Sequence, residues 1–477
     1  MTQNLRELAV QAMQAQGLRP EFPPAVLREA DAAWAPAEQG DVRDLRGLAW
    51  FSIDNDDTQD LDQLSVAEPL AAGATRLLVA IADVDALAPL GGAVDAHAGL
   101  NTTSVYTAAG TFPMLPPVLS TDRTSLHEGR ERLAVVVEMR VEADGTVTQQ
   151  ELYRAAVVNQ AKLTYDAVAL WLEGRQPELA AAPHIRQQVQ LHDQLATRLR
   201  QWRQRRGALD VRTVAARAVL QDGRLVDLRG DDRNRAKELI ADVMIATNAA
   251  VARYLSGRGF PSMRRVLEAP ARWERIVAIA ASHGVQLPAQ PDRVALDAFL
   301  RERREADPDS FGDLSLAIVK MLGAGEYALA LPGQEPAGHF GLAVSDYAHS
   351  TAPNRRYGDL VTQRLLKAAI AGQPPPYAAE ALAGIARHCT VQENAANKVE
   401  RHVLKAAASL LLADRIGDTF DALVTGAAPK GTFVRISRPM VEGRLVRGFE
   451  GADVGDTLQV RLLALDPVQG HIDFERA

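Results

Sequence analysis

The sequence is poor in cysteine and has no long apolar run. Cys389 is the only cysteine among 477 residues, which excludes an internal disulfide framework and favours a reducing cytoplasm. There is no stretch of about 18 uninterrupted apolar residues, the length that a membrane span requires. The N-terminal residues also lack the basic start and apolar core of a secretory signal, so we expect a cytoplasmic protein with no membrane partner.

The chain also lacks the strong positive charge of a protein coated in phosphate-binding residues. Its formal net charge is −7, although arginine is concentrated at residues 198–206 and 301–304. Two interpretations of these clusters stay open. They line a basic channel in a protein whose net charge is negative, or they are solvated faces of helices. The length predicts about two to four domains, because one hydrophobic core does not grow to this size.

Residue patterning divides the chain into three parts and predicts an α+β fold. Residues 1–46 have helical spacing, with proline at the start of a second helix. Residues 47–416 begin with apolar strands and the hairpin turns Asp144-Gly145 and Asp222-Gly223, and become mostly helical after residue 231. Residues 417–477 return to short strands separated by glycines, which fits a small five-stranded barrel of the OB type.

A cluster of aspartates stands between two apolar segments near the start of the second part. Residues 51–65 read FSIDNDDTQDLDQLS, and crowded carboxylates repel one another unless a cation compensates them. Mg²⁺ is a suitable cation, because it takes oxygen ligands and shares them with substrate phosphates. The alternative is a solvated acidic loop without metal. The aspartates concerned are Asp54, Asp56, Asp57, Asp60 and Asp62.

The C-terminal part combines aromatic and basic residues. Such a combination can form a stacking and basic face for single-stranded nucleic acid. Core packing is the alternative explanation for each phenylalanine taken alone. The residues are Phe420, Phe433 and Phe449, with Lys430, Arg435, Arg438 and Arg444.

Five local motifs, read together and in order, resemble the RNase II/RNase R family of exoribonucleases. After the aspartates come SVY followed by FPMLPP, then HFGLA, STAPNRRYGDL and NKVER, at residues 104–106, 112–117, 339–343, 350–360 and 397–401. The resemblance implies an RNB-type mixed α/β catalytic domain over residues 47–416 and an OB-fold RNA-binding barrel over residues 417–477. The N-terminal module of residues 1–46 is too short for the cold-shock domains that family members usually carry there.

The resemblance implies an activity and a cofactor. We expect Mg²⁺-dependent, processive 3′-to-5′ hydrolysis of single-stranded RNA from its 3′ end, with release of nucleoside 5′-monophosphates and a role in RNA turnover. The family's acidic motif matches Asp54, Asp60 and Asp62, but Gln63 stands where a fourth aspartate is expected. Because a glutamine oxygen carries no charge, we expect one ion to bind more weakly, or Asp56 or Asp57 to substitute as its ligand.

The family match also implies roles for residues outside the aspartate cluster. Arg355 matches an arginine that contacts the phosphate near the cleaved bond, with Arg356 as a second candidate, and Glu400 matches a glutamate near the leaving nucleotide. Tyr106 matches the aromatic residue that stacks on the terminal base, and Tyr165 matches a tyrosine near the ribose. The alternatives are an ion pair of Arg355 with Asp359, a surface carboxylate for Glu400 and core packing for both tyrosines.

Two further departures from the family pattern concern the hold on the RNA. Val211 occupies the place of a phenylalanine that clamps the RNA stack, so we expect a limit product of different length. The helix sequence EEAM is replaced by residues 241–244, ADVM, which removes one acid of a ribose-sensing pair and leaves Asp242.

Two rivals to an active exoribonuclease follow from these departures. Gln63 favours an RNA-binding protein with a degenerate RNB site, and the altered ribose-sensing helix favours a nuclease that acts on DNA. We expect a monomer, and the sequence identifies no protein partner.

Overall fold

The fold is α+β, as predicted, and combines a large mixed sheet, covering helices and a separate barrel. The computed structural model describes residues 2–34, 41–211, 215–221, 224–231, 233–270, 272–308, 311–334, 338–428 and 431–477. Its helices are α1 (Thr2–Ala15), α2 (Pro24–Ala32), α3 (Ala93–Asn101), α4 (Tyr165–Leu172), α5 (Pro183–Gln204), α6 (Arg235–Gly257), α7 (Trp273–Ser282), α8 (Arg293–Ala306), α9 (Phe311–Leu322), α10 (Tyr357–Ile370) and α11 (Ala379–Leu411).

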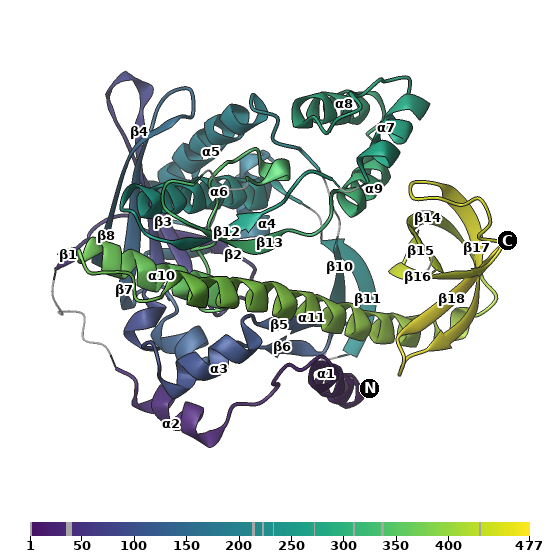
Figure 1. The fold of residues 1–477 in the computed structure, drawn as a ribbon, viewed down its shortest axis with the longest axis horizontal. Coiled ribbons are helices and arrows are strands. Elements are labelled where there is room, and N and C mark those ends of the chain that lie inside the picture. Colours follow the sequence, from purple (N-terminus) through teal and green to yellow (C-terminus); the bar gives the residue numbers. More distant parts are fainter. Residues whose placement is uncertain are drawn as a thin grey trace.

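The large sheet has seven strands in the order β1-β8-β7-β4-β3-β2-β9 (Figure 1). Pairing is antiparallel from β8 through β2, whereas the two edge strands, β1 and β9, pair in parallel. The strands are β1 (Val42–Asp44), β2 (Phe51–Asp54), β3 (Gln63–Pro69), β4 (Thr75–Ala82), β7 (Glu131–Val141), β8 (Val147–Val158) and β9 (Ala161–Thr164).

The main hydrophobic core lies between this sheet and the helices that cover it. β4 contributes a continuous buried run from Leu77 to Ala82, as expected for a strand covered on both faces. Helices α5 and α6 pack on β3, β7 and β8, and α10 also packs on β8. Helix α6 is long and apolar enough to cross a membrane by length and composition, but 61% of its apolar window is buried in this core. Its hydropathy is therefore explained by packing inside the protein.

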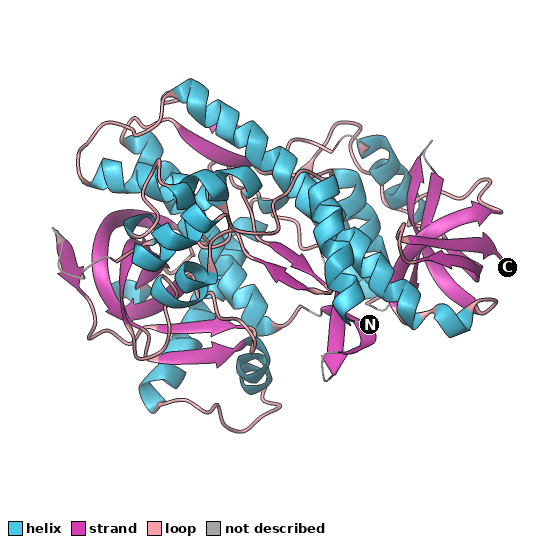
Figure 2. Cartoon of the chain, turned by 90° about the horizontal axis from the view of Figure 1, so that it is seen from below, coloured by secondary structure: helices cyan, strands magenta, loops and turns pink. Residues whose placement is uncertain are grey.

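The 33-residue helix α11 connects the sheet to the barrel (Figure 1). Its N-terminal part joins the main core through Leu382, Ala386 and Cys389. Farther along, Val399 and Val403 share a cluster with the N-terminal helix α1 and with the hairpin β5 (Val105–Thr107) and β6 (Gly110–Phe112). Helix α1 packs against α11, and in the view from below the helix at the N mark lies beside other helices (Figure 2). The N-terminal helices therefore pack onto the rest of the protein and have no separate core.

The C-terminal strands close into a five-stranded barrel, which confirms the predicted OB-type fold. Along β15 buried residues alternate with half-buried ones, so that Val434 and Ile436 point into the barrel core. The predicted basic residue Lys430 lies outside the described residues. The strands are β14 (Thr419–Ala428), β15 (Gly431–Ser437), β16 (Met440–Arg447), β17 (Thr457–Asp466) and β18 (His471–Arg476).

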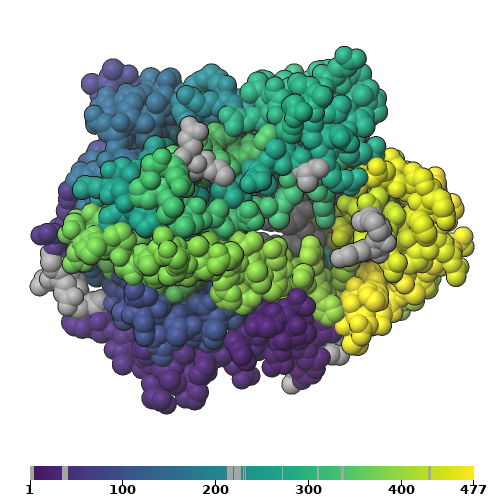
Figure 3. Space-filling view, viewed as in Figure 1, coloured from purple at the N-terminus to yellow at the C-terminus, as the bar shows by residue number. Residues whose placement is uncertain are grey.

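Two smaller elements join the barrel to the sheet domain. Helices α7–α9 form their own cluster, which includes Val454 of the barrel. Leu228, on the hairpin β10 (Ala215–Gln221) and β11 (Arg224–Asp231), belongs to the barrel cluster; the turn predicted at Asp222-Gly223 lies outside the described residues. In the space-filling view, a hollow opens between α11, the barrel and the helices above them (Figure 3). The remaining hairpin pairs β12 (Ser262–Val266) with β13 (Glu326–Ala330).

Candidate active site

Two buried aspartates lie at one edge of the large sheet. Strand β2 ends at Asp54 and the antiparallel β3 begins directly after Asp62, so both carboxylates lie at the same strand ends. Asp54 is 8% exposed and Asp62 is 3% exposed. Asp60, half-buried in the connecting loop, raises the pKa of both carboxyls by electrostatic repulsion, after the larger effect of burial. The fold thus brings together the three aspartates that the sequence singled out.

Asp62 is held by the segment that precedes α10. Its Oδ1 accepts a hydrogen bond of 3.0 Å from the main-chain N–H of Asn354, and its Oδ2 lies 3.3 Å from Nε of Arg355. Burial raises the pKa of Asp62 to about 7, and the nearby Arg355 guanidinium opposes the shift. The aspartate and the arginine therefore form one unit, although 292 residues separate Asp62 from Asn354.

The Asp54 carboxylate has fewer hydrogen-bond partners than that of Asp62. Its Oδ2 is buried and has no hydrogen-bond partner among the described residues. Burial raises the pKa of Asp54 to about 6, with a hydrogen bond from Ser52 and the charge of Lys162 opposing the shift. A buried carboxylate is costly unless a charge compensates it. A divalent cation at the free oxygen would supply that charge.

The residues fit a metal that completes its coordination with other oxygens. Within the described ranges, no three His, Cys, Asp or Glu side chains form a group that could hold an ion. Gln63, the first residue of β3, is half-buried and brings a neutral oxygen to the position next to Asp62. Mg²⁺ commonly binds through one or two carboxylates together with water and substrate phosphates. Metal binding by Asp54, Asp60, Asp62 and Gln63 stays a prediction, whereas the substitutes Asp56 and Asp57 are exposed on the loop.

Two residues that the sequence did not single out anchor the aspartate loop. The Lys162 ammonium, on β9, donates to the carbonyls of Asp56 and Thr58 at 3.0 and 2.7 Å. The Ser125 hydroxyl donates to the carbonyl of Gln59 at 2.6 Å and accepts from the N–H of Leu61 at 2.9 Å. Both act on main-chain atoms, so no motif of side chains indicates them.

Tyr106 and Glu400 come from different elements and meet at the site. Tyr106, on β5, is 44% exposed, and its main-chain N–H donates to Oε1 of Glu400 on α11 at 2.9 Å. Burial raises the pKa of Asp60, and a hydrogen bond from the Tyr106 hydroxyl is among the effects that oppose the shift. The tyrosine therefore presents an accessible ring beside the aspartates. Glu400 therefore has a contact that positions Tyr106, and its role near the leaving nucleotide stays a prediction.

Tyr165 lies on the other side of Asp54. It is the first residue of α4, a helix capped by the Thr164 hydroxyl. Burial raises the pKa of the Tyr165 hydroxyl, and the Asp54 carboxylate adds to the shift. Its half-buried ring packs against the main core while its hydroxyl feels the charge of Asp54, so contact with the ribose stays a prediction.

Arg355 and Arg356 have different partners. Arg355 points to Asp62 and its side chain is 41% exposed, so its remaining donors can reach a ligand. Arg356 pairs with the buried Asp359 at 2.7 Å. The ion pair with Asp359 that the sequence suggested for Arg355 is therefore made by Arg356. RNA binding by Arg356 stays a prediction.

The barrel aromatics fall into two classes. Phe420 is 8% exposed and packs edge-on against Phe474, with ring centroids 6.3 Å apart, so it is a core residue. Phe433 is half-buried on the outer face of β15, and Nζ of Lys405, on α11, lies 5.6 Å from its ring centroid. Phe449 is 44% exposed. Phe433 and Phe449 therefore keep surfaces that a base could cover.

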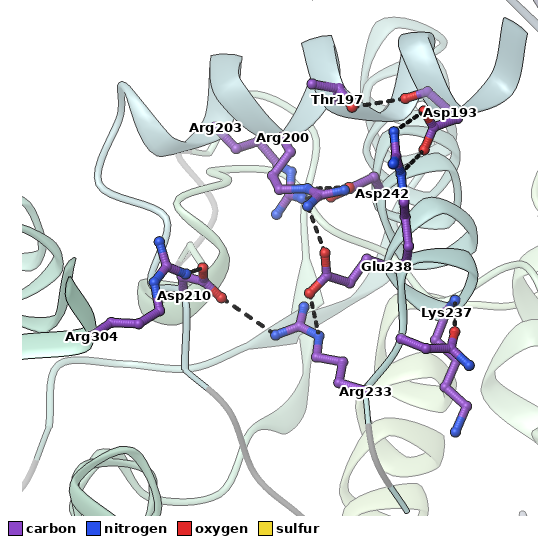
Figure 4. A network of polar contacts seen from close by, with 12 residues as sticks. Asp193, Thr197, Arg200, Arg203, Asp210, Arg233, Lys237, Glu238, Asp242 and Arg304 are labelled. Atoms are coloured by element: carbon purple, nitrogen blue, oxygen red, sulfur yellow. Dashed lines mark hydrogen bonds and ion pairs between the residues drawn. The ribbon is translucent and has the colours of Figure 1, made fainter. Parts of the chain in front are cut away.

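Two arginines of the first cluster pair with acids of α6, whereas Arg205 and Arg206 at its end are exposed. Arg200 pairs with Glu238 and Asp242 at 2.6 and 2.8 Å, and Arg203 pairs with Asp242 as well (Figure 4). Asp242, which the sequence left as the remaining acid of a ribose-sensing pair, thus has two arginine partners. Val211, at the predicted clamp position, is half-buried and packs against the α7–α9 cluster.

Comparisons with known families assign most of the chain to two domains. The family described as RNB domain matches residues 42–372, and the family described as RNase II-type exonuclease C-terminal S1 domain matches residues 418–477. Ribonuclease R of Thermotoga maritima is 30% identical over 95% of this chain and 68% of its own length. Exoribonuclease 2 of Escherichia coli is 34% identical over 70% of this chain and 52% of its own length.

A solved structure extends the likeness to the whole fold. RNase R of Mycoplasma genitalium, in complex with ribose-methylated single-stranded RNA, superposes with a TM-score of 0.88 at 22% identity. The match covers 99% of this chain and 78% of that one. The chain spans between about half and two thirds of the length of the curated relatives it matches.

Proposed function

The chain belongs to the RNB family of exoribonucleases, and we propose that it degrades single-stranded RNA processively from the 3′ end in a Mg²⁺-dependent reaction that releases nucleoside 5′-monophosphates. The contact of Arg355 with buried Asp62, beside the unpartnered oxygen of Asp54, carries this proposal. This contact supports the proposal, because a guanidinium that could bind a phosphate lies beside buried carboxylates whose pKa values are raised by burial.

The proposed reaction follows from the chemistry of these groups. Water attacks the phosphorus between the last two nucleotides and the P–O3′ bond breaks, so the phosphate leaves on the released nucleotide and the shortened RNA ends in a 3′-hydroxyl. Bound Mg²⁺ supplies Lewis acidity that activates the water and offsets phosphate charge. Asp54 and Asp60 would hold the ion, with the neutral oxygen of Gln63 as a further ligand.

The other residues bind and position the RNA. The exposed donors of Arg355 stabilise charge that develops on the phosphate, while its Nε stays on Asp62. The ring of Tyr106 stacks on the terminal base, a contact that does not depend on base identity. Tyr165 lies where it can contact the ribose, and Phe433 extends the path onto the barrel. We propose a monomer that acts in the cytoplasm, where the thiol of buried Cys389 stays reduced.

One assay tests the reaction and the assignment of Asp62. The wild type should shorten 5′-labelled single-stranded RNA and release nucleoside 5′-monophosphates with Mg²⁺ but not with EDTA. A DNA strand of the same sequence should persist. Asp62→Asn should reduce cleavage by about 10³-fold while RNA binding, measured by fluorescence anisotropy, changes little. Loss of binding with unchanged cleavage by the bound fraction would contradict the assignment.

An RNA-binding protein with a degenerate site is the second candidate. Gln63 and the lack of a ready three-carboxylate group within the described ranges favour it. The same assay separates the two, because this candidate binds RNA tightly and releases no nucleotide at any Mg²⁺ concentration. Equal degradation of the DNA strand would instead favour the third possibility, a nuclease without sugar discrimination.

A further inference from the structure

A cavity of about 460 Å³ lies close to the candidate active site and takes no part in the proposed reaction. Asp83 and Leu133, in its wall, stand next to the ends of β4 and at the start of β7, at the same sheet edge as Asp62. Since neighbouring strands are about 4.8 Å apart, β7 is about 10 Å from β3. Another wall residue, Thr124, donates a hydrogen bond to the side-chain oxygen of Asn354, whose N–H holds Asp62. The wall of the cavity is therefore connected to Asp62 through Thr124 and Asn354.

Three arginines line this cavity. Among the described residues, no carboxylate forms an ion pair with Arg123 or Arg130, and Arg123 donates to main-chain carbonyls at the end of α2. Arg132 likewise donates to main-chain carbonyls, and its nearest acid, Asp122, is 3.8 Å away and largely exposed. Burial lowers the pKa of Arg132, and the neighbouring Arg130 charge adds to that effect. Like charges thus crowd together here without full compensation.

The remaining acids of the wall, Asp83 and Glu131, are paired with basic residues that do not line the cavity. Asp83, whose side chain is fully buried, pairs with Arg154 at 3.1 Å and with Lys367 at 2.8 Å. Glu131 pairs with Arg46 at 2.8 Å. The carboxylates therefore leave the cavity with a surplus of positive charge.

An aromatic side chain completes the wall. Trp34 lines the cavity and is 78% exposed, which is unusual for an indole in a folded protein. An exposed ring beside clustered guanidinium groups suits a ligand that has both an aromatic plane and a phosphate, because bases stack on aromatic rings and arginine binds phosphate through several donors.

We propose that this cavity binds a nucleoside 5′-monophosphate, with its phosphate on Arg130 and Arg132 and its base against Trp34. The identification of the ligand as reaction product rests on the proposed function. A processive enzyme keeps its RNA in the entrance channel between cycles, and this RNA blocks the channel. A released nucleotide must therefore bind elsewhere on the protein or leave by a different route. An arginine-lined cavity that is connected to Asp62 through Thr124 and Asn354 is suited to hold that nucleotide.

Calorimetric titration of the full chain with AMP, in EDTA and without RNA, tests the proposal. We expect saturable binding of one AMP per chain. Arg130→Ala should weaken it by about tenfold through loss of charge-assisted hydrogen bonds. Trp34→Ala should weaken AMP binding by about tenfold through loss of stacking and leave the binding of inorganic phosphate unchanged. Arg258→Ala, at an exposed arginine after α6, is the matched control and should change neither.

The outcomes separate the cavity from the reaction centre. If Tyr106→Ala abolishes AMP binding and Arg130→Ala does not, the nucleotide occupies the reaction centre and the proposal is wrong. It is equally wrong if AMP does not bind, or if AMP binds no more tightly than inorganic phosphate. If Arg130-dependent AMP binding is found in a chain that releases no nucleotide from RNA, the cavity assignment stands and the proposed function fails. Thermal melting of each variant verifies that it is folded.

Discussion

Two groups of buried aspartates in this protein differ in how their charge is compensated. Asp242, on α6, is 4% exposed and meets two guanidinium groups, those of Arg200 and Arg203. Asp54 and Asp62, at the ends of β2 and β3, are buried to a similar extent but share a single nearby guanidinium, that of Arg355. Two guanidinium groups therefore serve one carboxylate in the first group, whereas in the second Arg355 and the Lys162 ammonium serve the three carboxylates of Asp54, Asp60 and Asp62.

The difference indicates which group serves structure and which serves chemistry. Buried charges that are paired hold one helix against another. Removing one partner leaves the other charge buried without compensation, which destabilises the fold. Buried carboxylates with little positive charge nearby instead favour the binding of a cation. Residues with strongly shifted pKa values are concentrated at functional sites. The α5–α6 network and the β2–β3 edge should therefore respond oppositely to the same kinds of substitution.

The largest difference should appear between the adjacent Arg355 and Arg356. Arg355→Ala should lower the rate of nucleotide release by about 10²–10³-fold, because a donor to the developing phosphate charge is lost. Arg356→Ala should chiefly lower the free energy of unfolding, by about 3 kcal/mol, because Asp359 stays buried without its cation. Single-turnover cleavage and urea unfolding measure the two effects. Equal losses of stability in both variants would contradict the distinction.

Asp242→Asn should destabilise the protein. Arg203 is mostly buried and would lose its charged partner, so the free energy of unfolding should fall by about 3 kcal/mol. The folded fraction should still release nucleotide, because this network is separate from the aspartates. Asp62→Asn is the matched variant at the other group, with the opposite pattern of retained stability and lost cleavage. Urea unfolding followed by an activity assay without denaturant checks both.

Asp54→Asn should make the protein more stable at neutral pH without metal. The pKa of Asp54 rises from 3.8 to about 6 on folding, so the folded state binds more protons than the unfolded state between these values. Stability therefore falls as pH rises through that window, and the full cost, about 1–3 kcal/mol, is present above it. The gain from Asp54→Asn should be absent below the window and complete above it. Paired urea titrations in EDTA measure this gain.

Magnesium provides the control for that experiment. Because a ligand that binds the folded state stabilises it, excess Mg²⁺ should raise the stability of the wild type and shrink the advantage of Asp54→Asn. An advantage that does not depend on pH would show that the buried charge is not its cause.

The sequence predicted the barrel and the acidic edge but not the partner of each buried charge. The spacing of glycines and short strands indicated the barrel, and the density of aspartates indicated the acidic edge, because both signals are local. The partner of each charge was not predictable, since Asn354 and Lys162 reach the site from distant segments and through main-chain atoms. Arg355 and Arg356 are adjacent and identical in type, so only the backbone geometry before α10 decides which one faces Asp62.

Substitution of Gln63 should have the smallest effect on cleavage. It tests most directly whether the acidic edge has too few charged ligands for a cation. Gln63→Asp adds a carboxylate beside Asp62 at the start of β3. If the edge is short of ligands for a cation, this change should lower the Mg²⁺ concentration for half-maximal cleavage by about tenfold, because affinity follows the charge of the ligands. Without metal it should instead lower stability, since it adds another carboxylate to a crowded site.

The two readouts of Gln63→Asp should therefore move in opposite directions. Gln63→Glu, which places the same charge one methylene farther out, tests whether position matters as well as charge. Mg²⁺ titrations of cleavage and urea unfolding in EDTA give both quantities for each variant. A Mg²⁺ requirement that is unchanged in Gln63→Asp would mean that Asp54 and Asp60 already satisfy the ion with water and phosphate. The uncharged residue would then be a tolerated substitution, and the acidic edge would lack a counter-charge only when RNA and metal are absent.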